Sequence, residues 1–385
     1  MTTNDVFPIS GFVAPGFEPV RAAFESNFQK SAEVGAAVHV TVDGQAVVDL
    51  WGGTADAART RPWNPDTIVN VWSTTKGWLA LAMHMLAEHG LLDLEAQVAR
   101  YWPEFAQNGK DGVLVRHLLT HTAGLPGCSM KVPDATIYDW AAMIRYLEKS
   151  TLLWAPGTKC GYHAGTFGWL NGEVLRRITG VSVGTFLRSE IAEPLKADVA
   201  IGVTPEEIER AADIRPPSPL QSWLMRVMFA VGGKAKSRAF TNPPRPPRAA
   251  NTRRWREAEI PSSNGHASAR GLARLYTPLA LGGAVGSVRL LSEANVQRAC
   301  QEQIHARDIV AGSVVRRSLG FMLSDPAEGD PRPSTAFGHP GMGGSLGFAD
   351  PSHRLAFGYV MNRMAFAIDD RASALCRSLY SCLEK

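Results

Sequence analysis

The feature that most constrains this chain is a long apolar run that directly follows its only Ser-x-x-Lys motif. Residues 71–90 read VWSTTKGWLALAMHMLAEHG, with Ser73 and Lys76 near the beginning of the run. Good helix formers fill the segment, and Gly90 stands where a left-handed C-terminal cap is expected. A helix that is apolar on every face belongs inside a domain. The sequence therefore predicts a buried helix whose first turn carries Ser73 and Lys76 on one face.

A lysine at this place is chemically unusual. The N-terminal end of a helix favours anions, and burial removes the water that stabilises an ammonium group, so both effects lower the pKa of Lys76. Shifting a lysine pKa by three units from its usual value of roughly 10.4 corresponds to about 4 kcal/mol. A function would explain why the chain keeps such an unfavourable residue: a neutral amine can take the proton of Ser73 Oγ and make the serine a nucleophile. The alternative is a capping serine followed by a surface lysine.

Composition and charge restrict the class of protein. The chain has 385 residues, of which 45% are hydrophobic and 20% are charged, and its formal net charge is +4. This length fits one large domain or two closely packed ones, and the small net charge argues against nucleic acid as a partner. The first residues lack the basic and apolar regions of a signal peptide, and no uncharged apolar run reaches membrane-spanning length. We therefore expect a cytoplasmic protein without a membrane partner.

The patterning differs between the ends and the middle of the chain. Residues 36–51 read as a β-hairpin that turns at Asp43-Gly44, and period-two patterning returns at residues 318–323, 337–339, 344–348 and 354–361. Helical patterns cover residues 17–28, 137–149, 167–179, 185–195, 266–280, 292–301 and 368–383. These patterns predict an α+β fold in which both termini build an antiparallel sheet and a helical insertion lies between them.

Residues 216–256 break this pattern. The segment contains NPPRPPR and TRRWR and has no regular periodicity, so it is expected to be a Pro-rich basic connection. One interpretation is a solvated loop. A second is a flap over the substrate entrance, because long loops in compact enzymes are often lids. Binding of nucleic acid through the basic residues is a third, weaker interpretation.

Four motifs in order give the chain a family resemblance. The Ser-x-x-Lys motif at 73–76 is followed by RHLLTHTAGLP at 116–126, PGTKCGYHAGTFGWLNGEVLRRITG at 156–180 and FGHPGMGGSLGFADP at 337–351. With these motifs the chain resembles the serine β-lactamase-like superfamily. It is most similar to the esterases related to class C β-lactamases, the family VIII carboxylesterases. The resemblance extends from the first hairpin to the last helix.

The resemblance implies a β-lactamase/transpeptidase-like fold with two subdomains. Residues 1–92 and 263–385 would form an α/β subdomain, whose antiparallel sheet is flanked by helices. Residues 93–262 would form a mainly helical subdomain that contains the Pro-rich basic loop. The active site would lie at the interface of the two.

The resemblance also assigns two candidate residues outside the helix. Tyr162 matches the family tyrosine that faces the Ser-Lys pair, where a phenol can relay the proton of the nucleophile. The match is imperfect, because Ala164 stands where β-lactamases have an asparagine. A rival amide is Asn264, which follows two serines and is expected to contact substrate or to form a wall of the site.

The third family motif, Lys-Thr-Gly in β-lactamases, reads His339-Pro340-Gly341 here. Gly341 would let a substrate approach the strand closely. By analogy with the family, the backbone N–H groups of Met342 and Ser73 would form the oxyanion hole. His339 departs from the family lysine, and a histidine is mostly neutral at physiological pH. This departure moves the expected substrate toward uncharged esters.

Together these features predict a serine hydrolase that cleaves short-chain carboxylic esters through an acyl-enzyme on Ser73, with weak β-lactam hydrolysis compatible with the same core. The expected partner is a small-molecule ester, and neither a metal nor a cofactor is implied. Three alternatives remain open: a β-lactamase or D-amino-acid peptidase, an acyltransferase, and a binding protein that is acylated without turnover. The oligomeric state is also open.

A second serine matches a different nucleophile motif. Residues 343–347 read Gly-Gly-Ser-Leu-Gly, which fits the Gly-x-Ser-x-Gly elbow of α/β-hydrolases. That elbow needs a helix after the serine, whereas a hairpin is expected after Ser345. Asp350 and His353 also follow too soon to fold back on Ser345. We interpret this match as incidental.

Alanine substitutions distinguish the two serines. Ser73→Ala is expected to lower ester hydrolysis by ~10⁴-fold or more, because the acyl-enzyme can no longer form. Ser345→Ala is expected to keep most of the activity. Steady-state hydrolysis of p-nitrophenyl acetate measures both variants, and the opposite ranking would move the nucleophile to Ser345.

Overall fold

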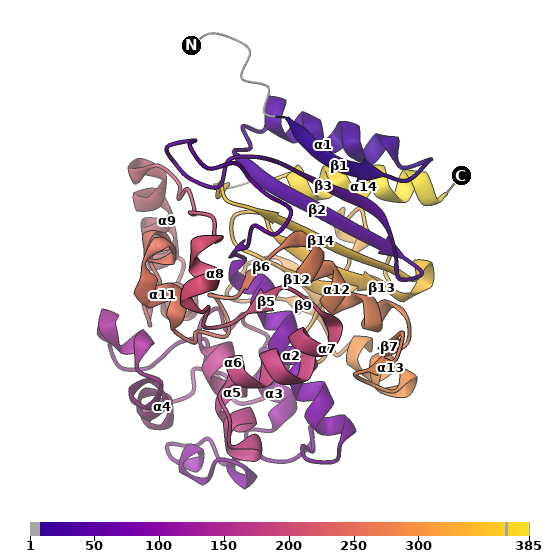
Figure 1. The fold of residues 1–385 in the computed structure, drawn as a ribbon. Helices are drawn as coiled ribbons and strands as arrows, with labels where there is room; N and C mark the ends of the chain where they lie inside the picture. Colours follow the sequence, from indigo (N-terminus) through magenta and orange to yellow (C-terminus); the bar gives the residue numbers. More distant parts are fainter. Residues whose placement is uncertain (1–7, 366–368, 385) are drawn as a thin grey trace.

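The computed structural model describes residues 8–365 and 369–384 and joins both ends of the chain in one nine-stranded antiparallel sheet (Figure 1). The strand order is β1-β3-β2-β14-β13-β12-β11-β10-β9. The strands are β1 Ile9–Val13, β2 Gly35–Val42, β3 Gln45–Gly53, β9 Ile304–Arg307, β10 Val314–Arg317, β11 Met322–Leu323, β12 Phe337–Pro340, β13 Leu346–Asp350 and β14 Leu355–Met361. This confirms the expected sheet from both termini. The strand expected at 318–323 is only β11, because residues 318–321 form a turn with Gly320 at φ +97°.

The predicted hairpin fixes the register of the sheet. Asp43 and Gly44 both have positive φ angles, +51° and +76°, which suits the two-residue turn between β2 and β3. Strand β14 then pairs with β2 from Leu355↔Val42 to Met361↔Ala36. The C-terminal strands are thereby placed directly beside the N-terminal hairpin.

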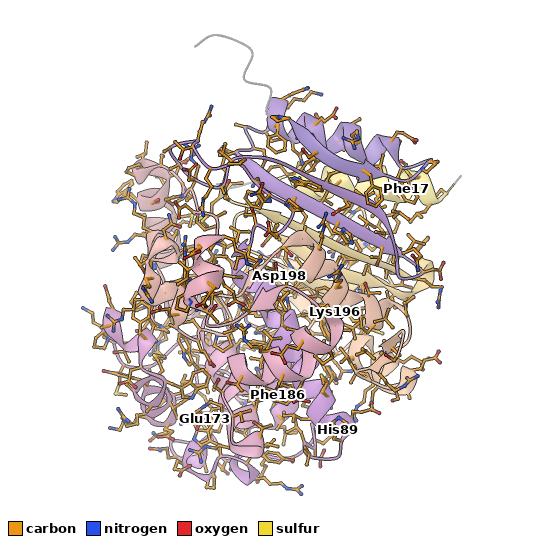
Figure 2. All side chains as sticks on the ribbon, viewed as in Figure 1. Phe17, His89, Glu173, Phe186, Lys196 and Asp198 are labelled. Carbon is orange, nitrogen blue, oxygen red and sulfur yellow. The ribbon has the colours of Figure 1, made fainter. Side chains whose placement is uncertain are left out.

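Helices cover both faces of this sheet. Helices α1 (Glu18–Lys30) and α14 (Arg371–Leu383) pack together on one face over a buried apolar cluster, and α12 (Ala269–Ala280) packs on the other face against β14, β13 and β2. Phe17 lies in the α1 layer, away from Glu173 and Phe186 in the helical part of the molecule (Figure 2). The remaining short elements here are β4 Val69–Asn70, β5 Val199–Ala200, β6 His266–Ala267, β7 Ala284–Val285, β8 Val288–Arg289 and α13 Glu293–Cys300.

The predicted interior helix is α2, Thr75–Glu88, and its residues from Thr75 to Leu86 are all buried. Ser73 belongs to a preceding 3-10 turn, Trp72–Thr74, and not to the α-helix itself. The surrounding helices are α3 Val115–Leu119, α4 Trp140–Lys149, α5 Thr166–Thr179, α6 Val183–Leu187, α7 Glu193–Leu195 and α8 Pro205–Glu209. Neither α2 nor any other helix in the described ranges is both long enough and apolar enough to cross a membrane.

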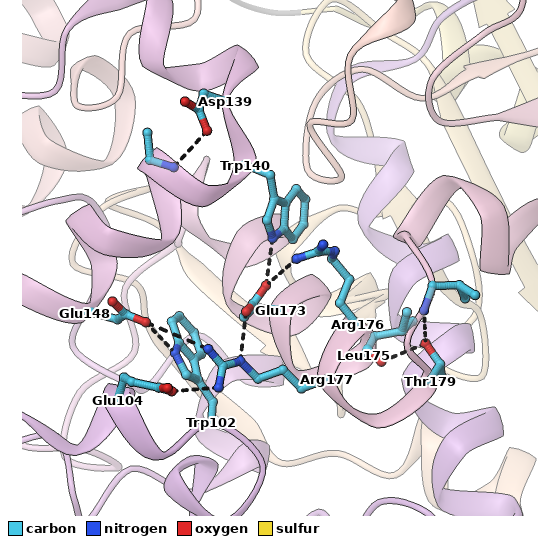
Figure 3. A network of polar contacts seen from close by, with 12 residues as sticks. Trp102, Glu104, Asp139, Trp140, Glu148, Glu173, Leu175, Arg176, Arg177 and Thr179 are labelled. Atoms are coloured by element: carbon cyan, nitrogen blue, oxygen red, sulfur yellow. Dashed lines mark hydrogen bonds and ion pairs between the residues drawn. The ribbon is translucent and has the colours of Figure 1, made fainter.

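A polar network fastens α5 to its neighbours (Figure 3). The buried Glu173 carboxylate accepts hydrogen bonds from Trp140 Nε1 at 2.7 Å, Arg176 at 3.0 Å and Arg177 at 2.8 Å. Arg177 also pairs with Glu104 at 2.6 Å. These contacts tie α4 and the segment around Glu104 to α5, whose N-terminal end lies at the site described below.

The expectation of an irregular segment at 216–256 is wrong. The segment forms α9 (Pro219–Val231), α10 (Lys234–Thr241) and α11 (Arg253–Glu257), with a 3-10 turn at Pro247–Asn251. Ser218 caps α9 in a capping box with Gln221, and Pro219 occupies the first turn, where its missing N–H is harmless. The prolines therefore mark helix boundaries.

A buried ion pair links α14 to the rest of the sheet layer. Arg371 donates to Glu33 Oε2 at 2.7 Å, and both side chains are almost completely buried. Burial raises the pKa of Glu33, although the Arg371 charge and the Tyr359 hydroxyl oppose this shift. Arg371 also donates to the Gly343 carbonyl at 2.6 Å, so this one side chain supports the loop that follows β12.

Arg371→Met is expected to destabilise the fold by about 3–5 kcal/mol, because Glu33 would stay buried without its ionic partner. Arg377→Met is the matched control on the same helix. Arg377 pairs with Asp370 at an exposed position, where such a pair contributes about 0–1 kcal/mol. Urea unfolding followed by circular dichroism measures both free energies. Equal losses for the two variants would contradict the structural role of Arg371.

Candidate active site

Ser73 lies at a sharp junction between strand β4 and helix α2. The residue before it, Trp72, has a φ of +50°, a left-handed conformation that is uncommon for a bulky side chain. Val71 is fixed by a hydrogen bond from its N–H to the Gly265 carbonyl at 2.8 Å. Trp72 and Thr74 are buried, whereas Ser73 is partly exposed. The turn therefore presents the Ser73 hydroxyl to the outside of an otherwise buried segment.

Lys76 is fully buried, and its Nζ lies 3.1 Å from Ser73 Oγ. The amine also donates to the carbonyl oxygens of Ala164 and Ser262, each at 2.9 Å. Among residues 8–365 and 369–384, no carboxylate forms an ion pair with it. Burial, together with the positive charges of Arg245 and Arg317, lowers the pKa of Lys76 well below its usual value. This environment favours the neutral amine.

Lys110 is an informative contrast within the same chain. Its side chain is also inaccessible to solvent, although less deeply buried, and its Nζ donates to the carbonyl oxygens of Gln107, Glu148 and Ser150 at 2.6–2.8 Å. Three carbonyls accept all three protons of an ammonium group. Lys76 has two carbonyl acceptors, and its third partner is the Ser73 hydroxyl, which can either accept a proton or donate one. When the amine is neutral, its two N–H groups satisfy the carbonyls and its lone pair can accept the Ser73 proton. Burial lowers the pKa of Lys110 only to about 8.

Tyr162 lies beside the Ser73–Lys76 pair, just before helix α5. Its ring centroid is 4.9 Å from Lys76 Nζ. Burial raises the pKa of Tyr162 to about 12, although a hydrogen bond with the Ser73 side chain opposes the shift. The phenol therefore stays protonated at neutral pH and can hold or pass on a proton. The structure brings together the three residues that the sequence assigned to catalysis.

The position of Tyr162 depends on a distant part of the chain. Its backbone N–H donates to Asp308 Oδ1 at 3.1 Å, and Asp308 pairs with Arg317 at 2.6 Å in a buried site. The Arg317 guanidinium lies 5.6 Å from the centre of the Tyr162 ring. Nothing in the sequence pointed to this pair, because neither residue belongs to a recognised motif and both lie about 150 positions after Tyr162.

Two histidines support the other side of the tyrosine. His163 Nδ1 is 2.6 Å from the Gly161 carbonyl, while its Nε2 accepts from the Leu125 N–H at 3.0 Å. The backbone N–H of His163 donates to His121 Nδ1 at 3.0 Å. The centre of the His121 ring lies 5.0 Å from that of the Tyr162 ring. Burial lowers the pKa of His163 to about 4 and that of His121 well below its usual value. Both rings are therefore neutral and pack around Tyr162. Their only indication in the sequence was that both stand within the family motifs.

The end of strand β12 approaches the Ser73 turn very closely. A Cβ at Gly341 would lie 2.2 Å from the Val71 carbonyl oxygen and 2.1 Å from Ser345 Oγ, so only glycine fits. Met342 follows in the same turn and is partly exposed. In the described part of the chain, no protein acceptor is found for its backbone N–H. An unpaired N–H at this place can hold a developing oxyanion.

His339 lies at the edge of this region, with its ring stacked 6.1 Å from that of Tyr162. Its Nδ1 is 2.7 Å from the Pro340 carbonyl, and its buried Nε2 has no hydrogen-bond partner within the described residues. Burial and the nearby Lys76 lower the pKa of His339 to about 3. The imidazole is therefore uncharged at neutral pH, unlike a lysine in this position.

The substrate contact expected from Asn264 does not fit the structure. The Asn264 side chain is completely buried, its Oδ1 accepts from the Ile260 N–H at 2.8 Å, and its Nδ2 donates to the Trp255 and Ala258 carbonyls. Every polar atom of the amide is thus used within its own loop. The same loop supplies the Ser262 carbonyl to Lys76, so Asn264 shapes a wall of the site instead of contacting substrate.

Ser345 also has a structural environment. Its Oγ donates to the Val71 carbonyl at 2.8 Å and lies 3.0 Å from Thr74 Oγ1. Strand β13 follows it, as the expected hairpin requires, and His353 pairs with Asp350 at 2.7 Å instead of with Ser345. Ser345 therefore joins the end of β12 to the Ser73 turn, and the elbow geometry is absent here.

Helix α10 and the segment after it cover the tyrosine. Phe240 lies 6.5 Å from the Tyr162 ring, and Ala239 joins Ala164 in a small buried cluster. Arg245 packs so closely on Gly165 that a Cβ there would lie 1.6 Å from its Nη1. Arg245 donates to backbone carbonyls of Pro243 and Ala239. The sequence analysis missed Arg245 because it stands in a proline-rich run typical of an exposed linker.

The chain is similar in sequence and in fold to several known proteins. A protein-family model described as Beta-lactamase matches residues 20–376. Esterase/beta-lactamase LipL of Mycobacterium tuberculosis is 36% identical over 367 residues, which cover 92% of this chain and 83% of LipL. A crystal structure of a family VIII carboxylesterase superposes with a TM-score of 0.89 at 41% identity, and that of a penicillin-binding protein homolog from Caulobacter crescentus does so with 0.89 at 37%. Both alignments cover 97% of this chain and 100% of the other.

The site geometry gives a one-sided pH profile. Activity requires neutral Lys76, so kcat/KM is expected to fall only below the lowered pKa of Lys76 and to stay level from neutral pH to about pH 10. The phenol of Tyr162, with a pKa of about 12, does not ionise in this range. Hydrolysis of 1-naphthyl acetate between pH 4.5 and 10 measures the profile.

Lys110→Met is the matched control for this profile, because it removes the other buried lysine outside the site. Its profile is expected to keep the wild-type shape even if the protein is less stable. A wild-type rate that rises only as the pH approaches 10, the behaviour of an ordinary lysine, would contradict a neutral Lys76 at pH 7.

Proposed function

The chain belongs to the Beta-lactamase family and is an esterase-type serine hydrolase of that superfamily, and we propose that it cleaves short-chain carboxylic esters through an acyl-enzyme on Ser73. The observation that carries the proposal is the 3.1 Å contact between Ser73 Oγ and the buried amine of Lys76. A serine is a weak nucleophile by itself and needs an adjacent base to remove its proton. Lys76 is that base in our proposal.

The first half of the reaction forms the acyl-enzyme. Ser73 Oγ attacks the ester carbonyl while its proton passes to Lys76 Nζ. The carbonyl oxygen becomes an oxyanion held by the N–H groups of Ser73 and Met342, and losing one such donor typically lowers the rate by ~10²–10³. The C–O bond to the alcohol then breaks, and the alcohol leaves with a proton supplied by Tyr162 or Lys76.

The second half returns the enzyme to its starting state. A water molecule attacks the acyl-enzyme carbonyl and gives its proton to the same base, and Ser73 regains a proton as the carboxylic acid leaves. The uncharged His339 and the substrate approach allowed by Gly341 support a preference for uncharged esters. The substrate-facing roles of both residues are part of the proposal.

The division of the chain belongs to the same proposal. Residues 1–92 with 263–385, and residues 93–262, form two subdomains with the site at their interface. In support, Lys76 belongs to residues 1–92, and both carbonyls to which it donates, those of Ala164 and Ser262, belong to residues 93–262. We also propose a cytoplasmic location, and that helix α10 with the Arg245 segment acts as a lid.

A second candidate function is β-lactam hydrolysis. A relative of similar length is named an esterase/beta-lactamase, and the Ser73–Lys76 arrangement is chemically suited to attack a lactam carbonyl. The uncharged His339 makes this the weaker candidate, because it offers no permanent cation for the carboxylate of a β-lactam. Turnover of nitrocefin far above that of p-nitrophenyl esters would reverse the order.

Labelling with a fluorophosphonate tests the nucleophile directly. The reagent is expected to modify Ser73, identified by mass in its peptide, and Lys76→Met is expected to lower the labelling rate by at least ~10²-fold. A panel of p-nitrophenyl esters of increasing chain length, run on the same preparation, is expected to favour short acyl groups.

The matched control for labelling is Lys110→Met, which should leave the rate unchanged. Label on another serine would contradict the assignment of Ser73. A stoichiometric burst without turnover would favour the binding-protein alternative, and formation of a new ester from an added alcohol would favour an acyltransferase.

A further inference from the structure

Helix α9 carries an apolar stripe that faces away from the protein. Its exposed large side chains recur at i, i+3, i+4, i+7, i+8 and i+11, which places them on one face of the helix. Trp223 is 59% exposed and Val231 is 77% exposed. The stripe consists of Leu220, Trp223, Leu224, Val227, Met228 and Val231. Helix α9 lies at the edge of the molecule (Figure 1). Its apolar face is exposed, whereas other helices bury such a face.

The segment around this helix is strongly basic. From residue 214 to residue 256 the chain contains ten Lys and Arg residues and neither Asp nor Glu. Arg226 on α9 and Lys234 at the beginning of α10 are exposed. Arg256 and Arg253 pair with the flanking carboxylates of Asp213 and Glu257, so the basic side chains exposed beside the stripe are those of Arg226 and Lys234. Apolar side chains flanked by basic ones are typical of helices that lie in the interface of anionic membranes.

A cavity opens at the N-terminal end of the same helix. It has a volume of about 300 Å³ and is lined in part by Ser218 and Gln221 of α9. Arg215 and Arg363 also line it, Arg363 with one hydrogen bond to the Ser31 carbonyl at 2.8 Å, and none of the residues lining it in the described chain is Asp or Glu. Arginine suits the binding of phosphate groups because its planar guanidinium donates two parallel hydrogen bonds. The cavity therefore matches an anionic headgroup beside the stripe.

The opposite face of α9 is connected to the active site through aromatic contacts. Phe229 stacks on Phe240 of α10, with ring centroids 4.2 Å apart and planes at 12°. Phe240 in turn lies 6.5 Å from the ring of Tyr162. We propose that the α9 stripe and the flanking basic residues dock the protein on an anionic lipid surface, so that the Ser73 site meets esters held in that surface. The second half of this proposal rests on the proposed function.

The charges favour a lipid surface over a second copy of this chain. Two copies that met through α9 would bring together basic residues without intervening carboxylates, whereas an anionic surface neutralises them. Six side chains on one 13-residue helix are also few compared with the roughly 20–30 residues per side of a stable interface. Docking of this kind needs no spanning helix, and it is an alternative to the expectation that the protein has no membrane partner.

Vesicle sedimentation with the full-length protein tests the docking. Wild-type protein is expected to bind vesicles of phosphatidylcholine with phosphatidylglycerol at least ~10-fold more strongly than vesicles of phosphatidylcholine alone, with binding lost in 0.5 M NaCl. Trp223→Gln with Met228→Gln is expected to lower binding at least ~10-fold. Leu91→Gln is the matched control, since Leu91 is 53% exposed outside the stripe. Arg226→Gln, on α9, is expected to weaken binding only to the anionic vesicles.

Activity measurements separate docking from the proposed function. All these variants are expected to keep wild-type kcat/KM on soluble p-nitrophenyl butyrate, while the stripe variant loses hydrolysis of p-nitrophenyl palmitate held in anionic vesicles. Loss of all ester turnover in wild-type protein that still binds vesicles would overturn the proposed function and leave docking intact. Docking is overturned if wild-type protein does not bind anionic vesicles, or if the stripe and Leu91 variants bind them equally. It is also overturned if light scattering shows that the stripe mediates a dimer instead.

Discussion

The site depends on a buried amine that has positive charges near it and no carboxylate paired with it among the described residues. Lys76 is surrounded by apolar residues and meets two backbone carbonyls and one hydroxyl, whereas Lys110 meets three carbonyls. Neither side chain is exposed to solvent, but Lys76 lies deeper and near Arg245 and Arg317, which lower its pKa, whereas the Glu148 carboxylate near Lys110 raises that of Lys110. A neutral amine at Lys76 gives Ser73 a base at hydrogen-bond distance, and the roles of the surrounding residues follow from that.

Three distant parts of the chain must meet for this arrangement to form. The N-terminal hairpin and the C-terminal strands share one sheet, which carries the end of β12 to the Ser73 turn. Gly341 allows the two backbones to touch, and Arg371 holds the Gly343 carbonyl in the same loop. The helical part contributes the Ala164 carbonyl and Tyr162. The fold thus assembles the site from elements that are each stabilised by contacts elsewhere.

The sequence alone was sufficient where a signal is local. Ser73 and Lys76 stand in one motif before one apolar helix, and the Asp43-Gly44 turn identifies its hairpin. Arg317 and Asp308 could not be found in this way, because their effect on Tyr162 depends on tertiary contacts across about 150 residues. Asn264 carried a motif signal that pointed to substrate, but its loop uses all of its polar atoms.

For the Pro-rich segment at residues 216–256, the local sequence signals led to a wrong prediction. Its prolines and basic residues suggested an irregular connection, yet Pro219 stands in the first turn of α9, where proline is tolerated. The periodic apolar residues of α9 were present in the sequence, but their exposed position could be learned only from the fold. That position is also what connects this segment to a lipid surface in our proposal.

The ionisation state of Lys76 at neutral pH tests the central claim most directly. Lysine labelled with ¹³C at Cε, observed by NMR in the folded protein and assigned with Lys76→Met and Lys110→Met, reports both buried amines in one titration. The account predicts that Lys76 has the chemical shift of a neutral amine at pH 7 while Lys110 has that of an ammonium group. A Lys76 signal that remains that of an ammonium group up to pH 9 would contradict it.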